Sequence, residues 1–304
     1  MKNTILILAA LLGAMLWTAC QNIEAEIIED LPDVEVVEGG YTLTVEASKG
    51  IGTKALSLDD TKLNAYWVDN EQVAVFLGGT QLGLLTATAD GSDNTKATLA
   101  GTLDSVAGVE ENGVLTLLYP RAQWDYTGQN GAAPSPDGNL ATKYDYATAS
   151  VTVASVNDGN RTITTTSGAN FANQQSMYRF GFKVGGEGAQ IAIKGFTVSS
   201  TNNALVRTRT WGGSDWTDVP GSLSVEVAGG TLTLPYASLR NTRVGSGNGD
   251  TYSFSVIGDD DALYLGSKDI PSSVMDTQGK FISAQSISVT KSNLAKSGTS
   301  PELW

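Results

Sequence analysis

Histidine is absent from this sequence of 304 residues, and cysteine occurs once, at Cys20. Without histidine there is no Ser-His-Asp triad, no Cys-His pair and no histidine-ligated metal site. A single cysteine also excludes a disulfide within the chain, so the fold depends on burial and hydrogen bonding. The sequence therefore predicts a protein that is not an enzyme and needs no cofactor and no metal, with carboxylate chemistry as the remaining alternative.

Positive charge is scarce as well. Lysine and arginine number 19 against 32 aspartates and glutamates, which gives a formal net charge of -13. Nucleic acids and anionic membrane faces favour basic patches, so we expect no nucleic-acid partner. The adjacent acids Asp259, Asp260 and Asp261 lack the alternating spacing and the distal glutamate of a calcium loop. They predict a solvated turn, and calcium binding there is the open alternative.

A hydrophobic run extends from Ile5 to Trp17, preceded by a basic start and followed by small residues. It is short for a membrane span and predicts a secretory signal peptide over residues 1–19. The stretch "LWTAC" resembles a bacterial lipobox. That resemblance implies cleavage before Cys20 and attachment of palmitate and other acyl chains, hence an outer membrane lipoprotein displayed at the cell surface. An ordinary buried cysteine is the alternative.

Residues 20–40 contain seven acidic side chains and no basic one. Such a run repels itself and stays extended, so it predicts a linker between the lipid anchor and a folded body. The body that follows is rich in Gly, Thr, Ser and Val. Its apolar residues recur with period two, as in "YTLTVEA", "MYRFGFKV" and "TYSFSVIG", which is typical of half-buried strands.

Turns divide these strands. The pair Gly229-Gly230 predicts a two-residue hairpin turn between Leu223/Val225/Val227 and Leu232/Leu234, and Asp259 to Asp261 predict the tip of a second hairpin. The Gly/Pro/Asn-rich residues 128–140 predict a loop. A polar break near residues 172–176 precedes a new aromatic strand, so we expect an all-β fold of two antiparallel β-sandwich domains, over residues 41–175 and 176–304.

The segment "GTKALSLDDTKLNAYWVDNEQVAVF", residues 52–76, resembles the signature of the fimbrillin family of bacterial surface lipoproteins. The matching residues are a Thr-Lys-Ala segment, a tryptophan before an acidic turn and an alternating strand: Thr53, Lys54, Ala55, Trp67, Asp69, Val73, Val75 and Phe76. Supporting matches are "LYP" at residues 118–120, "YDYATA" at 144–149, "MYRFGFKV" at 177–184 and "GKFISAQSISV" at 279–289. On physical grounds alone, Trp67 predicts an aromatic plug in the core.

The resemblance implies two tandem transthyretin-like domains and a role as a structural or accessory subunit of a cell-surface fimbrium, or pilus, that supports adhesion. It also implies cleavage by a trypsin-like protease after Lys54, with Lys49 as the alternative. Cleavage would remove the first strand, with Tyr41, Leu43 and Val45, and a donor strand from another fimbrial subunit would replace it, which is β-augmentation. A lipid-anchored pilus anchor that does not polymerise is the alternative role.

The donor strand is less well defined by sequence. Ile282, Ile287 and Val289 lie in a strand-like stretch that is either the last strand of the second domain or part of the donor, and Trp304 ends the chain. Trp211 and Trp216 flank a loop with nearby carboxylates, which is compatible with a glycan contact or with aromatic packing of the loop. A surface glycan-binding lipoprotein, with a host or bacterial ligand, is therefore the rival function.

Overall fold

A computed structural model of the chain describes residues 40–49, 57–59, 62–64, 66–135, 138–275 and 278–293. These residues belong to one unit, Gly39–Trp304. Their regular structure is strand apart from two short helices, which confirms the predicted all-β class. Within these ranges no helix is long and apolar enough to cross a membrane.

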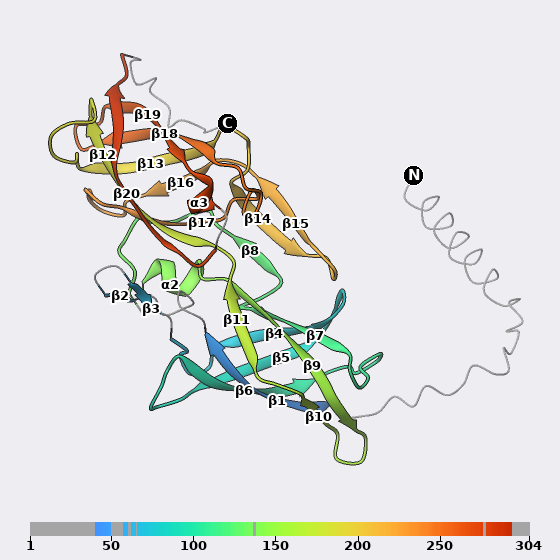
Figure 1. The fold of residues 1–304 in the computed structure, drawn as a ribbon. Helices are drawn as coiled ribbons and strands as arrows, with labels where there is room; N and C mark the ends of the chain where they lie inside the picture. Colours follow the sequence, from blue (N-terminus) through green and yellow to red (C-terminus); the bar gives the residue numbers. More distant parts are fainter. Residues whose placement is uncertain are drawn as a thin grey trace, which may run out of the picture. The chain divides into compact units, whose positions relative to one another are not determined.

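The first large sheet contains eight strands of the described chain, in the order β10-β1-β11-β9-β7-β4-β5-β6 (Figure 1). Their bounds are β1 (Tyr41–Lys49), β4 (Gln72–Leu77), β5 (Thr80–Ala89), β6 (Lys96–Leu103), β7 (Val114–Tyr119), β9 (Ala147–Asn157), β10 (Thr162–Thr165) and β11 (Ala169–Asn173). Because β1 also pairs with β6, the sheet closes on itself. A closed sheet has no free edge at that point.

Alternating side chains of these strands fill the inside of the first sheet. Leu43, Val73, Leu85, Leu99 and Leu115 are fully buried there. The outward positions are largely threonine, serine and charged residues, as the period-two pattern predicts for strands with one wet face. The core of this half therefore lies within the closed sheet.

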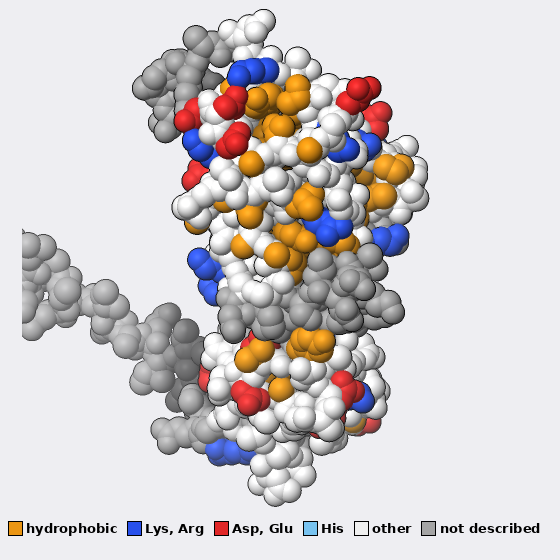
Figure 2. Space-filling view, turned by 90° about the vertical axis from the view of Figure 1, so that its left-hand side faces the viewer, with side chains coloured by type: hydrophobic (Ala, Val, Ile, Leu, Met, Phe, Trp, Pro, Cys, Tyr) orange, Lys and Arg blue, Asp and Glu red, His pale blue; other side chains and the backbone are white. Residues whose placement is uncertain are grey.

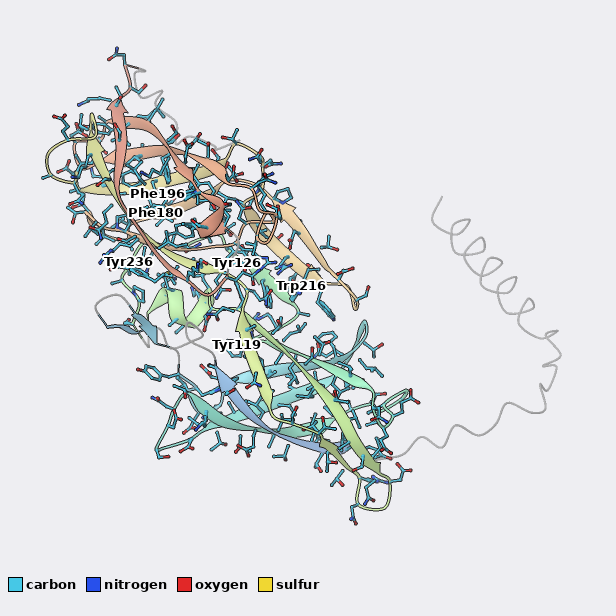
Figure 3. The ribbon with its side chains drawn as sticks, viewed as in Figure 1. Tyr119, Tyr126, Phe180, Phe196, Trp216 and Tyr236 are labelled. Carbon is cyan, nitrogen blue, oxygen red and sulfur yellow. The ribbon has the colours of Figure 1, made fainter. Side chains whose placement is uncertain are left out.

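The second large sheet has seven strands among the described residues, in the order β16-β13-β18-β19-β20-β12-β17. They are β12 (Ser176–Val184), β13 (Ile193–Ser200), β16 (Leu223–Glu226), β17 (Tyr236–Leu239), β18 (Asp250–Gly258), β19 (Leu263–Ile270) and β20 (Phe281–Lys291). Four phenylalanines, Phe180, Phe182, Phe196 and Phe254, pack against one another in its core, mostly edge-on or tilted; Figure 3 labels Phe180 and Phe196. The β18–β19 hairpin confirms the predicted turn at Asp259 to Asp261.

A small sheet joins the two halves of the sequence. It has the order β15-β14-β8, with β8 (Gln123–Asp125), β14 (Val206–Trp211) and β15 (Trp216–Pro220). A separate pair is formed by β2 (Ser57–Asp59) and β3 (Lys62–Asn64), and the short helices are α2 (Asn139–Lys143) and α3 (Ser272–Met275). The first half thus contributes a strand to a sheet built mainly by the second.

The predicted hairpin at Gly229-Gly230 is wrong. Gly229 does have the positive φ of 70° that a tight turn requires, but the two expected strands pair with β13 instead of with each other: β16 runs along it, and Leu232 forms an isolated antiparallel bridge to its Ile193. Gln129 lies between β16 and the later strand β17: its backbone oxygen accepts a hydrogen bond from Glu226, and its side chain binds both backbone groups of Ser238. Strand β13, from elsewhere in the sequence, is therefore the partner of both expected strands.

Candidate functional site

Strand β1 closes the first sheet and is the candidate functional element. It runs antiparallel to β6 over eight residue pairs, from Tyr41↔Leu103 to Ser48↔Lys96. Its other side is paired only at its ends, in parallel with β10 at Thr42 and Leu43 and with β11 from Ala47 to Lys49. The middle of β1 therefore has a complete ladder on one side and an interrupted one on the other.

The interruption lies on the outer surface as a groove of about 580 Å³. Its lining comes from β1 and from the β10–β11 bend and is mostly threonine: Thr42, Thr44, Glu46, Thr162, Ile163, Thr164, Thr165, Ser167 and Gly168. Gly168 is required here, because a Cβ at that position would lie 2.6 Å from the carbonyl oxygen of Glu46. The groove marks the side of β1 on which the strand is held less completely.

The inward side chains of β1 are part of the core. Tyr41, Leu43, Val45 and Ala47 are 6%, 0%, 2% and 4% exposed. Burial of one leucine or valine side chain contributes roughly 1.5–3 kcal/mol. If β1 left the sheet, a row of apolar contacts would lose its partner, and the row would need to be covered by another strand.

The start of β1 is fastened by a hydrogen bond. The Tyr41 hydroxyl donates to Oδ1 of Asp158 at 2.7 Å. This bond to a carboxylate raises the pKa of Tyr41 above its ordinary value. Asp158 follows β9 directly, so the bond ties the first residue of β1 to a neighbouring turn.

The end of β1 is fastened by a buried lysine. Nζ of Lys49 donates to the carbonyl oxygen of Tyr66 at 2.9 Å and to Oε2 of Glu71 at 3.1 Å. It also lies 3.7 Å from the centroid of the Trp67 ring and 5.0 Å from that of Tyr119. The Lys49 side chain is 1% exposed and that of Glu71 10%. We call Tyr66, Trp67, Glu71 and Tyr119 the lysine socket.

Aromatic packing positions the socket. Trp67 is 2% exposed, as the prediction of an aromatic plug expected, and it meets Tyr119 and Phe171 edge-on at 5.8 and 5.3 Å. Lys49 pairs with Phe171 across the β1–β11 ladder. Because Lys49 is enclosed, a protease reaches it only after the end of β1 unfolds. Cleavage after Lys49 and cleavage after Lys54 both stay predictions, and Lys54 lies outside the described residues.

The strand-like stretch near the end of the chain is β20, an inner strand of the second sheet. It pairs in parallel with β12 and antiparallel with β19. Ile287 and Val289 are 0% and 1% exposed, and Ile282 is partly buried against the same core. In this chain β20 therefore completes its own sheet. Its use as a donor stays a prediction, and Trp304 and Cys20 lie outside the described residues.

Trp211 and Trp216 face each other across the end of the β14–β15 hairpin. Their ring centroids are 5.4 Å apart with an interplanar angle of 63°, so the rings are not coplanar. Both pack on Ala74, Phe76 and Leu118, which project outward from the first sheet. Trp216 also contacts Trp124 at 3.9 Å. This geometry is that of aromatic packing between two sheets; the glycan contact stays a prediction.

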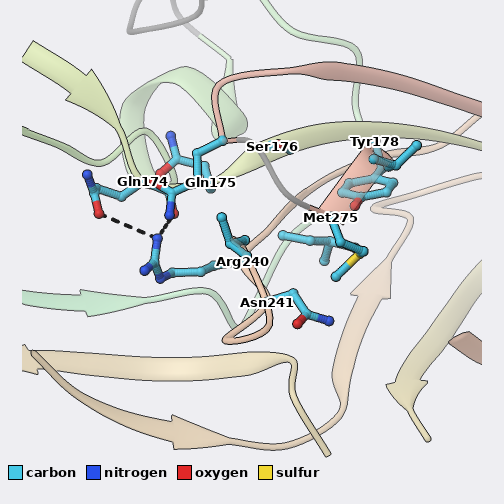
Figure 4. A pocket seen from close by; sticks show the side chains of 11 residues that line it. Gln174, Gln175, Ser176, Tyr178, Arg240, Asn241 and Met275 are labelled. Atoms are coloured by element: carbon cyan, nitrogen blue, oxygen red, sulfur yellow. Dashed lines mark hydrogen bonds between the residues drawn. The ribbon is translucent and has the colours of Figure 1, made fainter. Parts of the chain in front are cut away.

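A small cavity of about 10 Å³ lies beside Arg240. Figure 4 shows the guanidinium pointing at Gln174, whose backbone oxygen accepts a hydrogen bond at 2.6 Å. Burial, with Arg209 nearby, lowers the pKa of Arg240 from its ordinary value. The cavity has room for about one water molecule, so it is not a ligand site.

The carboxylates of the acidic turn bind side chains and a backbone amide of the same chain. Asp260 accepts hydrogen bonds from Lys291, Tyr264 and the Ala262 amide at 2.7, 3.0 and 3.0 Å, and Asp261 lies 3.1 Å from Nζ of Lys194. Among the described residues, no three His, Cys, Asp or Glu side chains are grouped to hold a metal ion. Figure 2 shows charged side chains of both signs dispersed over the face it presents.

The lysine socket is not among the sites that the sequence predicts. Lys49 is predicted only as the alternative cleavage site, and Glu71 and Tyr119 have no predicted role. The signal that could have found it is the period of β1: Lys49 continues the series of inward positions 41, 43, 45 and 47, so its side chain has to enter the core. A lysine at an inward position needs an acceptor or a carboxylate there.

Proteins similar to this chain were found among solved structures. No protein-family model and no curated protein sequence matches the chain. Among solved structures, the chain is similar to a candidate cell adhesion protein from Bacteroides ovatus, with 11% identity over 83% of this chain and 96% of the other and a TM-score of 0.42. It is also similar to the C-terminally truncated tip fimbrial protein Mfa3 from Porphyromonas gingivalis, with 11% identity over 75% and 81% of the two chains and a TM-score of 0.35.

Proposed function

We propose that the protein is a fimbrial subunit that supports adhesion and assembles by exchange of its first strand. In this proposal a protease cuts after Lys54, β1 leaves the first sheet, and an extended strand of another subunit takes its place. Before assembly the chain is held at the outer membrane through acyl chains on Cys20. The resemblance of residues 52–76 to the fimbrillin signature supports this function.

The observation that carries the proposal is the position of β1. It is the first strand of the described chain, and it closes the first sheet with a full ladder to β6 and a partial one to β10 and β11. A terminal strand of this kind can be separated by one cut without breaking any other strand. Its removal leaves both an open sheet edge and a row of uncovered apolar side chains, which together form the acceptor that β-augmentation requires.

A reversible staple tests this proposal. Thr44 and Ala100 are cross-strand partners of β1 and β6 with exposed side chains, so Thr44→Cys with Ala100→Cys places two cysteines at disulfide distance. We expect the wild-type protein, isolated from outer membranes, to begin at Ala55 and to run as a heat-labile ladder on non-boiled gels. The oxidised double variant should give no ladder, and reduction should restore it.

A matched staple serves as the control. Ser253 and Ser267 are exposed cross-strand partners of β18 and β19 in the second sheet. The variant with Ser253→Cys and Ser267→Cys should form the ladder with its disulfide closed, because neither strand has to leave. A ladder that persists in the oxidised Thr44/Ala100 variant would refute strand exchange at β1, as would a wild-type chain that still begins at Cys20 and stays monomeric.

A further inference from the structure

We propose that the lysine socket selects the strand that replaces β1 and sets its register, by accepting one lysine of an incoming segment. This inference rests on the proposed function, because the socket must first be vacated by β1. The partner is an extended segment of another chain with four inward apolar residues at alternate positions. The fourth of these residues is small, and a lysine follows two residues after it.

The need for such a device follows from the geometry of a strand. Alternation of apolar and polar residues fixes which face of a strand is inward, but a shift by two residues preserves that alternation. An acceptor that offered only apolar contacts would therefore accept an incoming strand in several registers. One position with a different chemical requirement removes this ambiguity, in the way that a single buried polar residue fixes the register of a coiled coil.

The inward positions of β1 inside the first sheet are not equivalent, because each holds a side chain of a different size. Tyr41 fills a site for a large aromatic side chain, and Leu43 and Val45 fill sites for aliphatic ones. Ala47, between Ala97 of β6 and Ala169 of β11, occupies its buried position with a small side chain. The sequence of sites thus runs from large to small before it reaches the socket.

The socket is the site that requires a cation. It offers the Tyr66 carbonyl and the Glu71 carboxylate at hydrogen-bond distance and two aromatic faces within 5.0 Å of the same nitrogen. If an apolar side chain entered instead, the Tyr66 carbonyl oxygen and the Glu71 carboxylate, whose side chain is 10% exposed, would each lose the hydrogen bond from Nζ. The loss of hydrogen bonds at a buried site is costly, so a strand without lysine at this position binds less tightly.

Peptide exchange into the full chain tests the inference. A specific protease site is introduced at positions 50–56, the chain is cut there, and the N-terminal piece is displaced in moderate urea. The chain is then offered the amidated peptide of residues 41–49, YTLTVEASK, or the same peptide with Lys49→Met. We expect the lysine peptide to bind at least about 10-fold more tightly, on the scale of a hydrogen bond to a charged group.

The Glu71→Gln chain separates selection from simple packing. It keeps the size of the side chain but removes the charge, so the preference for the lysine peptide should fall by about 10-fold or disappear. Glu111→Gln, at an exposed position, should leave the preference unchanged. Equal binding of both peptides would overturn the inference while leaving strand exchange intact. If neither peptide binds, the proposed exchange at β1 fails and the inference fails with it.

Discussion

Several charged side chains of the described residues form ion pairs. Lys49 binds Glu71, Arg209 binds Asp218, and Lys291 binds Asp260. Two of these pairs are buried and fix strands in place, whereas Lys291 and Asp260 are largely exposed. Buried pairs specify geometry more than they add stability, and exposed pairs add little of either. The two buried pairs therefore fasten strands, which is what the proposed structural role requires.

The pH response of Asp260 follows from its partners. Its hydrogen bond to Lys291 is the main cause that lowers the carboxyl pKa to about 2, from an ordinary value of 3.8. A lowered carboxyl pKa in the folded state stabilises the fold above pH 3.8, and this contribution is lost as pH falls towards 2. We expect carboxyl-detected NMR to give an Asp260 midpoint near 2.

Lys291→Met provides the matched variant for that titration. Without the ammonium, the Asp260 pKa should rise towards its ordinary value but stay below it, because Tyr264 and the Ala262 amide still donate. Stability measured by urea unfolding should then depend less on pH between 4 and 2 than in the wild-type chain. An Asp260 midpoint that does not move in the Lys291→Met chain would show that the ion pair is not the cause.

Among the strands, β5 and β6 are held unusually close by glycine. A Cβ at Gly101 would collide with the carbonyl oxygen of Leu84, and a Cβ at Gly83 would lie 2.7 Å from the carbonyl oxygen of Thr102. Both neighbours are backbone atoms, which cannot move without distorting the ladder. Since β6 is also the strand that holds β1 along its full length, the position of β6 determines how β1 is bound.

Gly101→Ala tests the importance of this close approach. We expect a loss of about 1–3 kcal/mol in the free energy of unfolding, as for other overpacked sites, because one strand has to shift to admit the methyl group. Gly91→Ala is the control, because a Cβ at Gly91 meets nothing within 4 Å. Urea unfolding followed by fluorescence measures both. Equal stability of the two variants would mean that β5 and β6 separate without cost.

The first half of the described chain contributes side chains to the core of the second half. Trp124 and Tyr126 come from the first half, are fully buried, and belong to the core of the second sheet. Tyr126 is also bonded by its backbone amide to the carbonyl oxygen of Arg207. Trp216 from the later hairpin packs against the same core, and Figure 3 labels it together with Tyr126. The boundary between residues 175 and 176 and the two transthyretin-like domains stay predictions, but the strands of residues 176–291 depend on an earlier segment.

Fragments of the chain test this dependence. A fragment of residues 176–293 lacks Trp124, Tyr126 and Gln129, so we expect weak near-UV circular dichroism and poor dispersion in NMR spectra, as for a chain without fixed packing. A fragment of residues 121–293 keeps all three residues and should be the better ordered of the two. Full native packing in the shorter fragment would show that the crossing segment is dispensable.

Local pattern was sufficient for much of the fold. Alternation in "YTLTVEA", "MYRFGFKV" and "TYSFSVIG" predicts β1, β12 and β18, because a strand with one buried face has to place apolar residues at every second position. The turn at Asp259 to Asp261 could be predicted for the same reason, since the strands on both sides are adjacent in sequence. The absence of histidine and the single cysteine likewise limit the chemistry without reference to any fold.

The strand partners and the lysine socket depend on pairing between segments that are distant in sequence. The pair Gly229-Gly230 predicts a hairpin, but the segments on both sides of it pair with β13, β16 along its length and Leu232 at Ile193. The lysine socket unites β1 with residues that follow it by 17 to 70 positions, and neither propensity nor period specifies such neighbours. Sequence fixes which face of each strand is apolar, whereas the choice of neighbouring strand depends on contacts that exist only after the sheet has closed.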